Sequence, residues 1–197
     1  CKAVGSVPTR KITEITRSRR RTRPQPVVER IMAHLRPETR DAIQALRLLG
    51  CRAGELQSAV VEGASVTLAT LKHEVRDTRT LVFDQGSPEG HFLLEHQGTP
   101  WKGMGADRLR KAWSRARAKE GLEQSPQYCL HAFRHECASR WKKESRAHMR
   151  ELYGDNWLAD CKDNSEEKAR LDEYRAPVAS RLGHNCMRST ALYGHTR

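Results

Sequence analysis

The sequence has no apolar run that approaches the roughly 20 residues needed to cross a bilayer. Its first residues, CKAVGSVPTRK, lack the apolar stretch of a signal peptide. The six cysteines are scattered without a Cys-x-x-Cys pair, so we expect reduced thiols and no disulfide framework. These absences argue against membrane, fibrous and secreted classes and predict a cytoplasmic protein. The chain of 197 residues begins with Cys and is expected to be part of a longer protein.

Positive charge is in large excess. The chain has 36 Lys and Arg residues against 24 Asp and Glu, which gives a net charge of +12. Residues 10–23 and 101–119 each carry seven basic residues and one acid, whereas residues 151–173 carry eight acids and three bases. A surplus of this size predicts a polyanion as partner, and nucleic acid is the commonest one.

Hydrophobic periodicity and helix-breaking residues predict a mainly helical chain. Val27, Ile31 and Leu35 recur at the spacing of one helical face. Pro37 is expected to open a second helix, which Gly50 closes. We expect further helices in these places: a short one from Ala53, 105–119, about 129–143, Pro177–Gly183, and a last short one that carries Tyr193.

Two β-branched runs predict a hairpin. SVTLATLK at 65–72 and RTLVFD at 79–84 lie on either side of the polar segment HEVRDT. The segment HFLLE at 91–95 is expected to add a short strand. The predicted fold class is therefore α+β, mainly helical, with a small antiparallel β-hairpin or sheet.

Four short stretches contain residue types suited to phosphate chemistry. The candidate residues are Arg52, Lys72, His131, Arg134, His184 and Tyr193. His131 and Arg134 are three residues apart and point from one helical face. His184 and Tyr193 are nine residues apart. No metal-binding motif accompanies them, so we expect catalysis by charge and covalent attack, without a metal or another cofactor.

These residue types match the needs of phosphodiester cleavage. Arginine stays ionised and donates a planar fork of hydrogen bonds, which suits the charge that builds on the non-bridging oxygens. A lysine desolvated against the substrate can protonate the leaving oxygen. A tyrosine phenol is a poor nucleophile unless neighbouring cations and a histidine favour its deprotonation. A phosphotyrosyl bond conserves the energy of the cut bond, so rejoining needs neither ATP nor metal.

The sequence resembles the catalytic domain of the tyrosine recombinases, the phage-integrase family. The resemblance is carried by four motifs in order: G-x-R-x-x-E-L, a hairpin lysine, L-H-x-x-R-H, and L-G-H with a tyrosine nine residues later. It covers residues 24–197 and implies the fold of that catalytic domain. It also implies a site-specific DNA recombinase that cleaves and rejoins double-stranded DNA through a 3′-phosphotyrosyl intermediate. Members act as tetramers on two synapsed sites, whereas the free fragment is expected to be a monomer associated with DNA.

The resemblance implies a role for each candidate residue. The implied roles are binding of the scissile phosphate by Arg52 and Arg134, general acid catalysis by Lys72, proton transfer by His131, phosphate contact by His184 and nucleophilic attack by Tyr193. Glu55 would be a buried structural partner. Arg76 and Arg79 lie close to Lys72 in the sequence, which leaves the choice of the hairpin cation open.

The predicted organisation is a basic arm at 1–23 followed by a catalytic domain at 24–197. Arg134 and His184 are fifty residues apart, wider than is usual in the family, and an acidic insertion at about 144–176 accounts for the excess. Contacts to the DNA backbone are expected from two basic segments. The candidates are Arg17, Arg19, Arg20, Arg21 and Arg23 in the arm, and Arg108, Arg110, Lys111, Arg115 and Arg117 in the basic helix.

Other interpretations remain open at this point. The chain can be a DNA-binding module that keeps the fold without turnover. It can also be an enzyme like the type IB topoisomerases, which relax DNA with a similar set of side chains. His131 and His135 have a spacing that can hold zinc, with Cys137 nearby, but no HExxH motif or converging carboxylate accompanies them.

Overall fold

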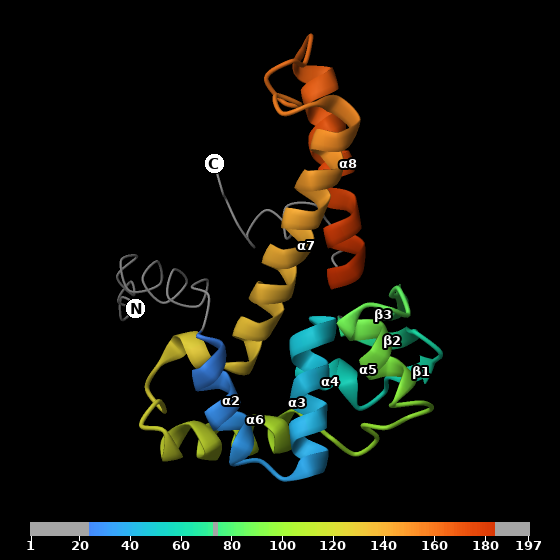
Figure 1. Ribbon diagram of the computed structural model, residues 1–197. Coiled ribbons are helices and arrows are strands. Elements are labelled where there is room, and N and C mark those ends of the chain that lie inside the picture. The colour runs from blue at the N-terminus through green and yellow to red at the C-terminus, as the bar shows by residue number, and fades with distance from the viewer. Residues whose placement is uncertain (1–23, 73–74, 184–197) are drawn as a thin grey trace, which may run out of the picture.

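A computed structural model describes residues 24–72 and 75–183 of the chain, without the side chains of 70–77. It is mainly helical with one small antiparallel sheet, as the sequence predicts (Figure 1). The elements in chain order are α2 (Gln25–Ala33), α3 (Pro37–Leu49), α4 (Ala53–Leu56), β1 (Val60–Glu62), β2 (Ser65–Lys72), β3 (Val75–Val82), α5 (Pro88–Leu94), α6 (Ala106–Lys119), a 3-10 turn (Pro126–Tyr128), α7 (Leu130–Tyr153) and α8 (Asn164–Leu182).

The first helices follow the sequence signals. Pro37 occupies the first turn of α3, where its missing N–H costs nothing. Gly50 ends α3 in the left-handed conformation with φ of 59°. A Cβ atom at this position would lie 2.7 Å from Cβ of Cys137, so glycine is also required by the close approach of α7. The end of α3 is therefore fixed against α7.

The sheet consists of three antiparallel strands in the order β1-β2-β3. Lys72 pairs with Val75, which leaves a connection of only two residues at the tip of the hairpin. The expectation of a longer polar connection, HEVRDT, is wrong, because residues 75–78 of this segment pair with β2. Thr67 and Thr80 face each other across the strands, with their hydroxyls 2.9 Å apart.

The segment HFLLE is helical rather than extended, so the predicted additional strand is wrong. It belongs to α5, whose start is set by Ser87 and Pro88. The Ser87 side chain accepts a hydrogen bond from the backbone N–H of Gly90, which satisfies one N–H of the first turn. This cap and the burial of Leu93 outweigh the extended preference of the apolar run.

Helices α7 and α8 are longer than the sequence predicts. The predicted helix at about 129–143 continues to Tyr153, and the helix expected to start at Pro177 starts at Asn164, with Pro177 inside it. Asp163 caps α8 by accepting hydrogen bonds from the N–H groups of Ser165 and Glu166. Residues 144–176 therefore form the distal part of α7, a turn and the first part of α8.

The two long helices run antiparallel and project from the rest of the molecule (Figure 1). We call residues 145–174 the acidic arm. The arm is held by its own contacts, because Ser145 donates to the carbonyl of Tyr174 at 2.7 Å and Arg170 donates to the carbonyl of Trp157 at 2.6 Å. Met149 and Trp157 are buried within it.

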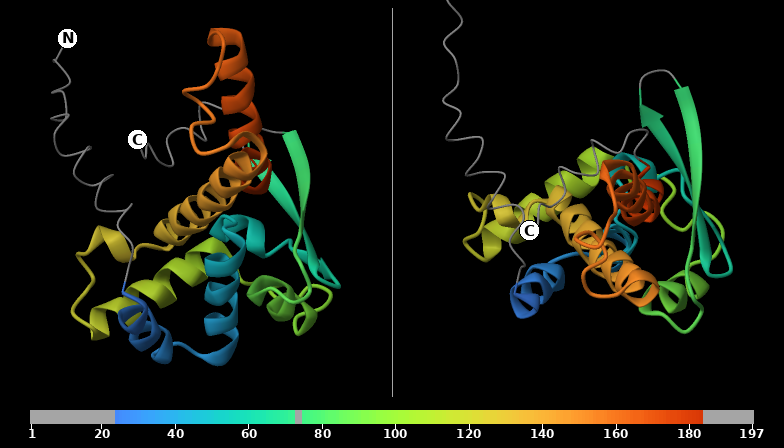
Figure 2. Two further views of the ribbon diagram at one scale, coloured as in Figure 1. Left: turned by 45° about the horizontal axis from the view of Figure 1, so that its top comes forward. Right: turned by 90° about the horizontal axis from the view of Figure 1, so that it is seen from above.

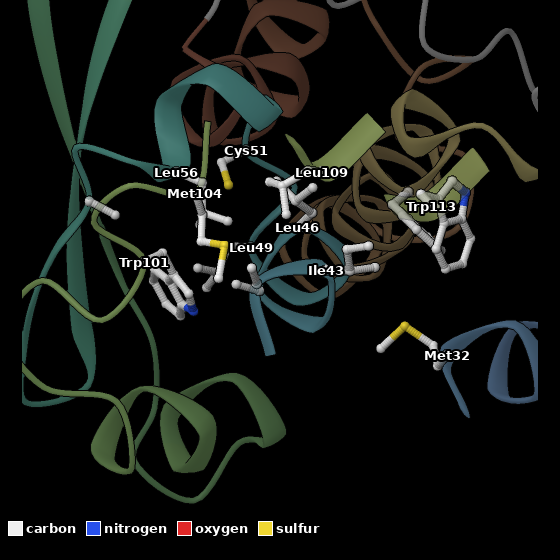
Figure 3. Packing of buried hydrophobic residues seen from close by; sticks show 14 of the residues in the cluster. Met32, Ile43, Leu46, Leu49, Cys51, Leu56, Trp101, Met104, Leu109 and Trp113 are labelled. Carbon is white, nitrogen blue, oxygen red and sulfur yellow. The ribbon is translucent and has the colours of Figure 1, made fainter. Parts of the chain in front are cut away.

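The main core lies around α3. Ile43, Leu46 and Leu49 of α3 occupy the middle of this cluster, with Trp113 of α6 on one side and Trp101 on the other (Figure 3). A smaller cluster joins α7 to α8 through residues that include Trp141 and Leu182. No helix among the described residues is both long and apolar enough to cross a membrane.

Candidate functional site

Glu55 lies at the centre of a group of arginines. Its side chain is only 4% exposed, and it accepts hydrogen bonds from the backbone N–H of Arg52 at 2.8 Å and from Nη1 of Arg52 at 2.7 Å. Arg79 of β3 binds the same carboxylate with both terminal nitrogens, at 2.7 and 3.2 Å. Glu55 is therefore a buried partner of two arginines, and it joins α4 to β3.

The charge of Glu55 is held by these contacts. Burial alone would raise the pKa of Glu55, but the hydrogen bonds and charge of Arg79, together with the hydrogen bonds from Arg52, lower it from 4.5 to about 2. The carboxylate therefore stays ionised at neutral pH. It fixes one side of the Arg52 guanidinium, while the Arg52 side chain remains 35% exposed.

Arg134 is placed differently from Arg52. It lies on the first turns of α7, is 1% exposed, and donates from Nη1 to the carbonyl of Gly50 at 2.7 Å. Its Nη2 donates to the carbonyl of Leu182 at the end of α8. Gly50 directly follows α3, and Leu182 is the last residue of α8. One buried guanidinium therefore joins the ends of two helices.

The end of α8 is bound by a second arginine. Nε of Arg79 donates to the carbonyl of Arg181 at 3.2 Å. The last carbonyls of a helix lack partners within the helix and carry partial negative charge, so two cations are favourable here. Gly183 follows with φ of 62°, and a Cβ atom there would lie 2.6 Å from Nη1 of Arg79. Figure 2 shows this end of α8 beside the sheet.

The junction of α3 and α7 is reinforced in the same way. Sγ of Cys137 donates to the carbonyl of Arg47 at 2.9 Å, and Arg140 donates to the carbonyl of Leu48 at 2.9 Å. Burial raises the pKa of the Cys137 thiol to about 12, and burial also raises the pKa of Cys51 to about 12. Both thiols are protonated at neutral pH, which makes them unsuited to nucleophilic attack.

The structure brings some of the candidate catalytic residues near one another. Arg52 and Arg134 both belong to this region, since Arg134 bonds to Gly50, two residues before Arg52. His131 is exposed on the first turn of α7, with its ring centroid 4.9 Å from that of His135. The side chain of Lys72 at the end of β2, and residues His184 and Tyr193, lie outside the described part of the structure.

The alternative of a zinc site finds no geometric counterpart in the described residues. Cys137 contacts the end of α3 rather than sharing a ligand position with the two histidines. Within residues 24–72 and 75–183, no three His, Cys, Asp or Glu side chains gather as metal ligands would.

The candidate DNA-contacting residues of α6 have different environments. Arg108 and Arg115 are exposed and line a hollow beside α2 and α3. Arg110 forms an ion pair with Asp107 at 2.7 Å, and Lys111 is exposed. Arg117 donates to the carbonyls of residues 123 and 125, so it holds the loop that follows α6. The candidates of the basic arm lie in segment 1–23, outside the described part of the structure: Arg17, Arg19, Arg20, Arg21 and Arg23.

Two features of this region have no counterpart among the sequence predictions. The sequence marks Arg79 only as a neighbour of Lys72, although it binds both Glu55 and the end of α8. The one available signal is its position on a strand that follows a hairpin lysine. Arg36 and Lys119 also line the hollow beside α6, and only a helical projection of 108, 112, 115 and 119 groups Lys119 with Arg108.

Comparisons with known proteins add no relative. No protein-family model matches the chain, and comparison with curated proteins and with solved structures gave no significant match.

Proposed function

We propose that the chain is the catalytic domain of a tyrosine recombinase, an enzyme that cuts and rejoins DNA through a phosphotyrosyl bond. The observation that carries this proposal is the bonding of Arg134 to the carbonyls of Gly50 and Leu182. These carbonyls lie two residues before Arg52 and two residues before His184. Three motifs that are far apart in the sequence therefore meet at one guanidinium, as a shared site would require.

The electrostatics of the site support this reaction. Arg52 is anchored by Glu55 on one side and is the more exposed arginine, so its remaining N–H groups can reach a phosphate. Arg134, which is buried, and Arg79, whose side chain is 10% exposed, add further positive charge to this region. Positive charge fixed in advance stabilises the negative charge that develops on the phosphate oxygens in the transition state.

In the proposed reaction, the phenolic oxygen of Tyr193 attacks the phosphorus of the scissile phosphodiester. The bond from phosphorus to the tyrosine oxygen forms, and the bond from phosphorus to the 5′ oxygen breaks. Lys72 gives its proton to the leaving 5′ oxygen, and His131 accepts the proton that the tyrosine phenol loses. The reverse sequence, with a different 5′ hydroxyl as nucleophile, rejoins the strands.

One observation favours a second candidate, a DNA-binding module without turnover. The Arg134 guanidinium is 1% exposed and is directed at two backbone carbonyls rather than at the surface. A phosphate could reach it only after a rearrangement at the end of α8. A module of this kind would bind DNA through its basic surface while the arginine serves only the fold.

Covalent trapping separates the two candidates. The protein is incubated in EDTA with a pool of nicked duplexes of randomised sequence, and adducts that resist SDS are counted. If the chain is the enzyme, the native protein should form an adduct and Tyr193→Phe should not. Tyr153→Phe is the matched control, since Tyr153 lies on the acidic arm, and it should form the adduct normally.

Each outcome is informative. Salt-sensitive binding to the same duplexes with no adduct would support the module and count against the enzyme. An adduct that persists in Tyr193→Phe would assign the nucleophile elsewhere. If an adduct forms, assays of plasmid relaxation and of strand exchange on the selected duplex separate a topoisomerase-like enzyme from a recombinase.

A further inference from the structure

A group of cations lines a hollow between α6 and the turn that joins α2 to α3. The hollow has a volume of about 370 Å³, roughly twelve times the 30 Å³ share of a water molecule in the liquid. We call it the basic hollow. Its lining residues that carry the argument are Arg36, Arg108, Arg115, Lys119, Ala112 and Ala116.

The shape of the basic hollow follows from the sequence of α6. Arg108, Arg115 and Lys119 project from one face of the helix because they are seven and four residues apart. Ala112 and Ala116 lie between them on that face, and their small side chains leave the space open. His34 and the buried side chains of Leu35 and Thr39 complete the lining from the side of α2 and α3.

The charge of the basic hollow is not neutralised by the protein. Within the described residues, no carboxylate forms an ion pair with Arg36, Arg108, Arg115 or Lys119. Two acids adjoin these cations in the sequence, and both are already bound: Asp107, next to Arg108, pairs with Arg110 at 2.7 Å, and Glu120, next to Lys119, is bound on both oxygens. The two carboxylate oxygens of Glu120 accept from Nε of Arg30 at 2.8 Å and contact Nε2 of His34 at 2.9 Å. All four cations are exposed and available to an anion.

The spacing of the cations fits a repeating anion. Arg108 and Lys119 are eleven residues apart on α6, a distance of about 16 Å along the helix axis. A duplex carries one phosphate per about 3.4 Å of axis on each strand, so several phosphates fall within this span. Unpaired bases stack on the rings of Phe, Tyr, Trp and His. The lining contains no Phe, Tyr or Trp, and its one ring, that of His34, already contacts Glu120 at 2.9 Å.

We propose that the basic hollow binds the phosphodiester backbone of duplex DNA. This inference deepens the proposed function, because it takes the substrate of that function as its ligand, but it concerns binding and involves no cleavage step. The contact is to the backbone, so it positions the duplex on the protein without reading the base sequence. The hollow is separate from the region around Glu55 and would hold DNA flanking the scissile phosphate.

The test is the salt dependence of binding to a fluorescent duplex of about 30 base pairs and mixed sequence. Arg108→Gln/Arg115→Gln removes two of the cations. We expect the slope of log affinity against log salt, measured from about 50 to about 200 mM, to become shallower by about 1.8, because about 0.9 is lost per phosphate contact. The affinity at the low end of the range should fall by at least about tenfold.

The matched control is Lys162→Gln/Lys168→Gln, which removes the same charge from exposed positions on the acidic arm. Its slope and affinity should equal those of the unchanged protein. Equal binding by the two double variants would overturn the proposal. Tighter binding of the native protein to a single-stranded oligonucleotide of the same length would also overturn it, because the hollow would then not select a duplex.

The outcome is distinguishable from failure of the proposed function. If the native protein forms no phosphotyrosyl adduct but the double variant still makes the salt slope shallower, the proposed enzyme is contradicted and DNA binding by the basic hollow is supported. If the adduct forms normally and the two double variants have identical salt slopes, the enzyme is supported and DNA binding by the basic hollow is contradicted. Melting temperatures of both variants within a few degrees of the native protein would show that the fold is retained.

Discussion

The arginines of the candidate site and the cations of the basic hollow differ in exposure and in their partners within the protein. Arg134 is buried and the side chain of Arg79 is only 10% exposed. Together they donate to a carboxylate and to backbone carbonyls at helix ends. Arg108 and Arg115 are exposed and face a hollow without a carboxylate partner among the described residues. The net charge of +12 therefore combines cations that hold the fold with cations that are available to a ligand.

This difference has an energetic consequence. A buried ion pair loses the solvation of both charges, and removal of one partner leaves the other uncompensated. An exposed cation keeps its water and contributes little to stability. Mutations in the two regions should consequently affect different measurements: stability near Glu55, and binding at the basic hollow.

The largest effect is expected for Glu55→Gln. The substitution leaves the largely enclosed Arg79 guanidinium beside a neutral amide and weakens the anchor of Arg52, so the free energy of unfolding should fall by about 3–5 kcal/mol. Urea titration measures this value. The matched control is Glu167→Gln on the exposed side of the acidic arm, which should change stability by less than about 0.5 kcal/mol. A similar small change in both variants would contradict the structural role of Glu55.

Acid should weaken the same ion pair in the native protein. The pKa of Glu55 is about 2 in the folded protein against an ordinary value of 4.5, so its contribution is complete above about pH 5 and is lost as the pH falls toward 2. The difference between these two pKa values corresponds to about 3 kcal/mol of the free energy of unfolding. Unfolding titrations between about pH 5 and pH 2 measure the loss, and Glu55→Gln should have a shallower pH dependence over this range. Parallel curves for the two proteins would refute this account.

The sequence predicts the helices of the body well because local signals mark their ends. Pro37 and Gly50 give both ends of α3, and the amphipathic pattern gives α6. It fails where a local preference is overridden. HFLLE contains β-favouring residues, but the Ser87 cap and the burial of Leu93 make it helical. Pro177 indicates a helix start, but the packing of α8 against α7 carries the helix through it.

The candidate site could be predicted only in part for a related reason. The resemblance carried by the order of the motifs predicts that Arg52, Glu55 and Arg134 belong to one site. The roles of Arg79 and Arg134 at the end of α8 depend on contacts across 102 and 48 residues, which no local pattern encodes. Likewise, the basic hollow joins α6 to Arg36, and a search for basic segments along the chain counts Arg36 with neither of them.

The smallest expected effect is a gain in stability, opposite in sign to the loss expected for Glu55→Gln. Arg115 is four residues from Lys111 and from Lys119, and like charges at this spacing destabilise a helix by about 0.2–0.5 kcal/mol per pair. Glutamine has nearly the same helix propensity as arginine. Arg115→Gln should therefore raise the free energy of unfolding by a few tenths of a kcal/mol at low salt, and the gain should vanish near 1 M salt, where charges are screened beyond about 3 Å. Urea titrations at the two salt concentrations measure it. A fall of more than about 1 kcal/mol in the free energy of unfolding at either concentration would mean that Arg115 stabilises the fold, as Arg134 does. It would count against the proposed role of Arg115 in binding DNA.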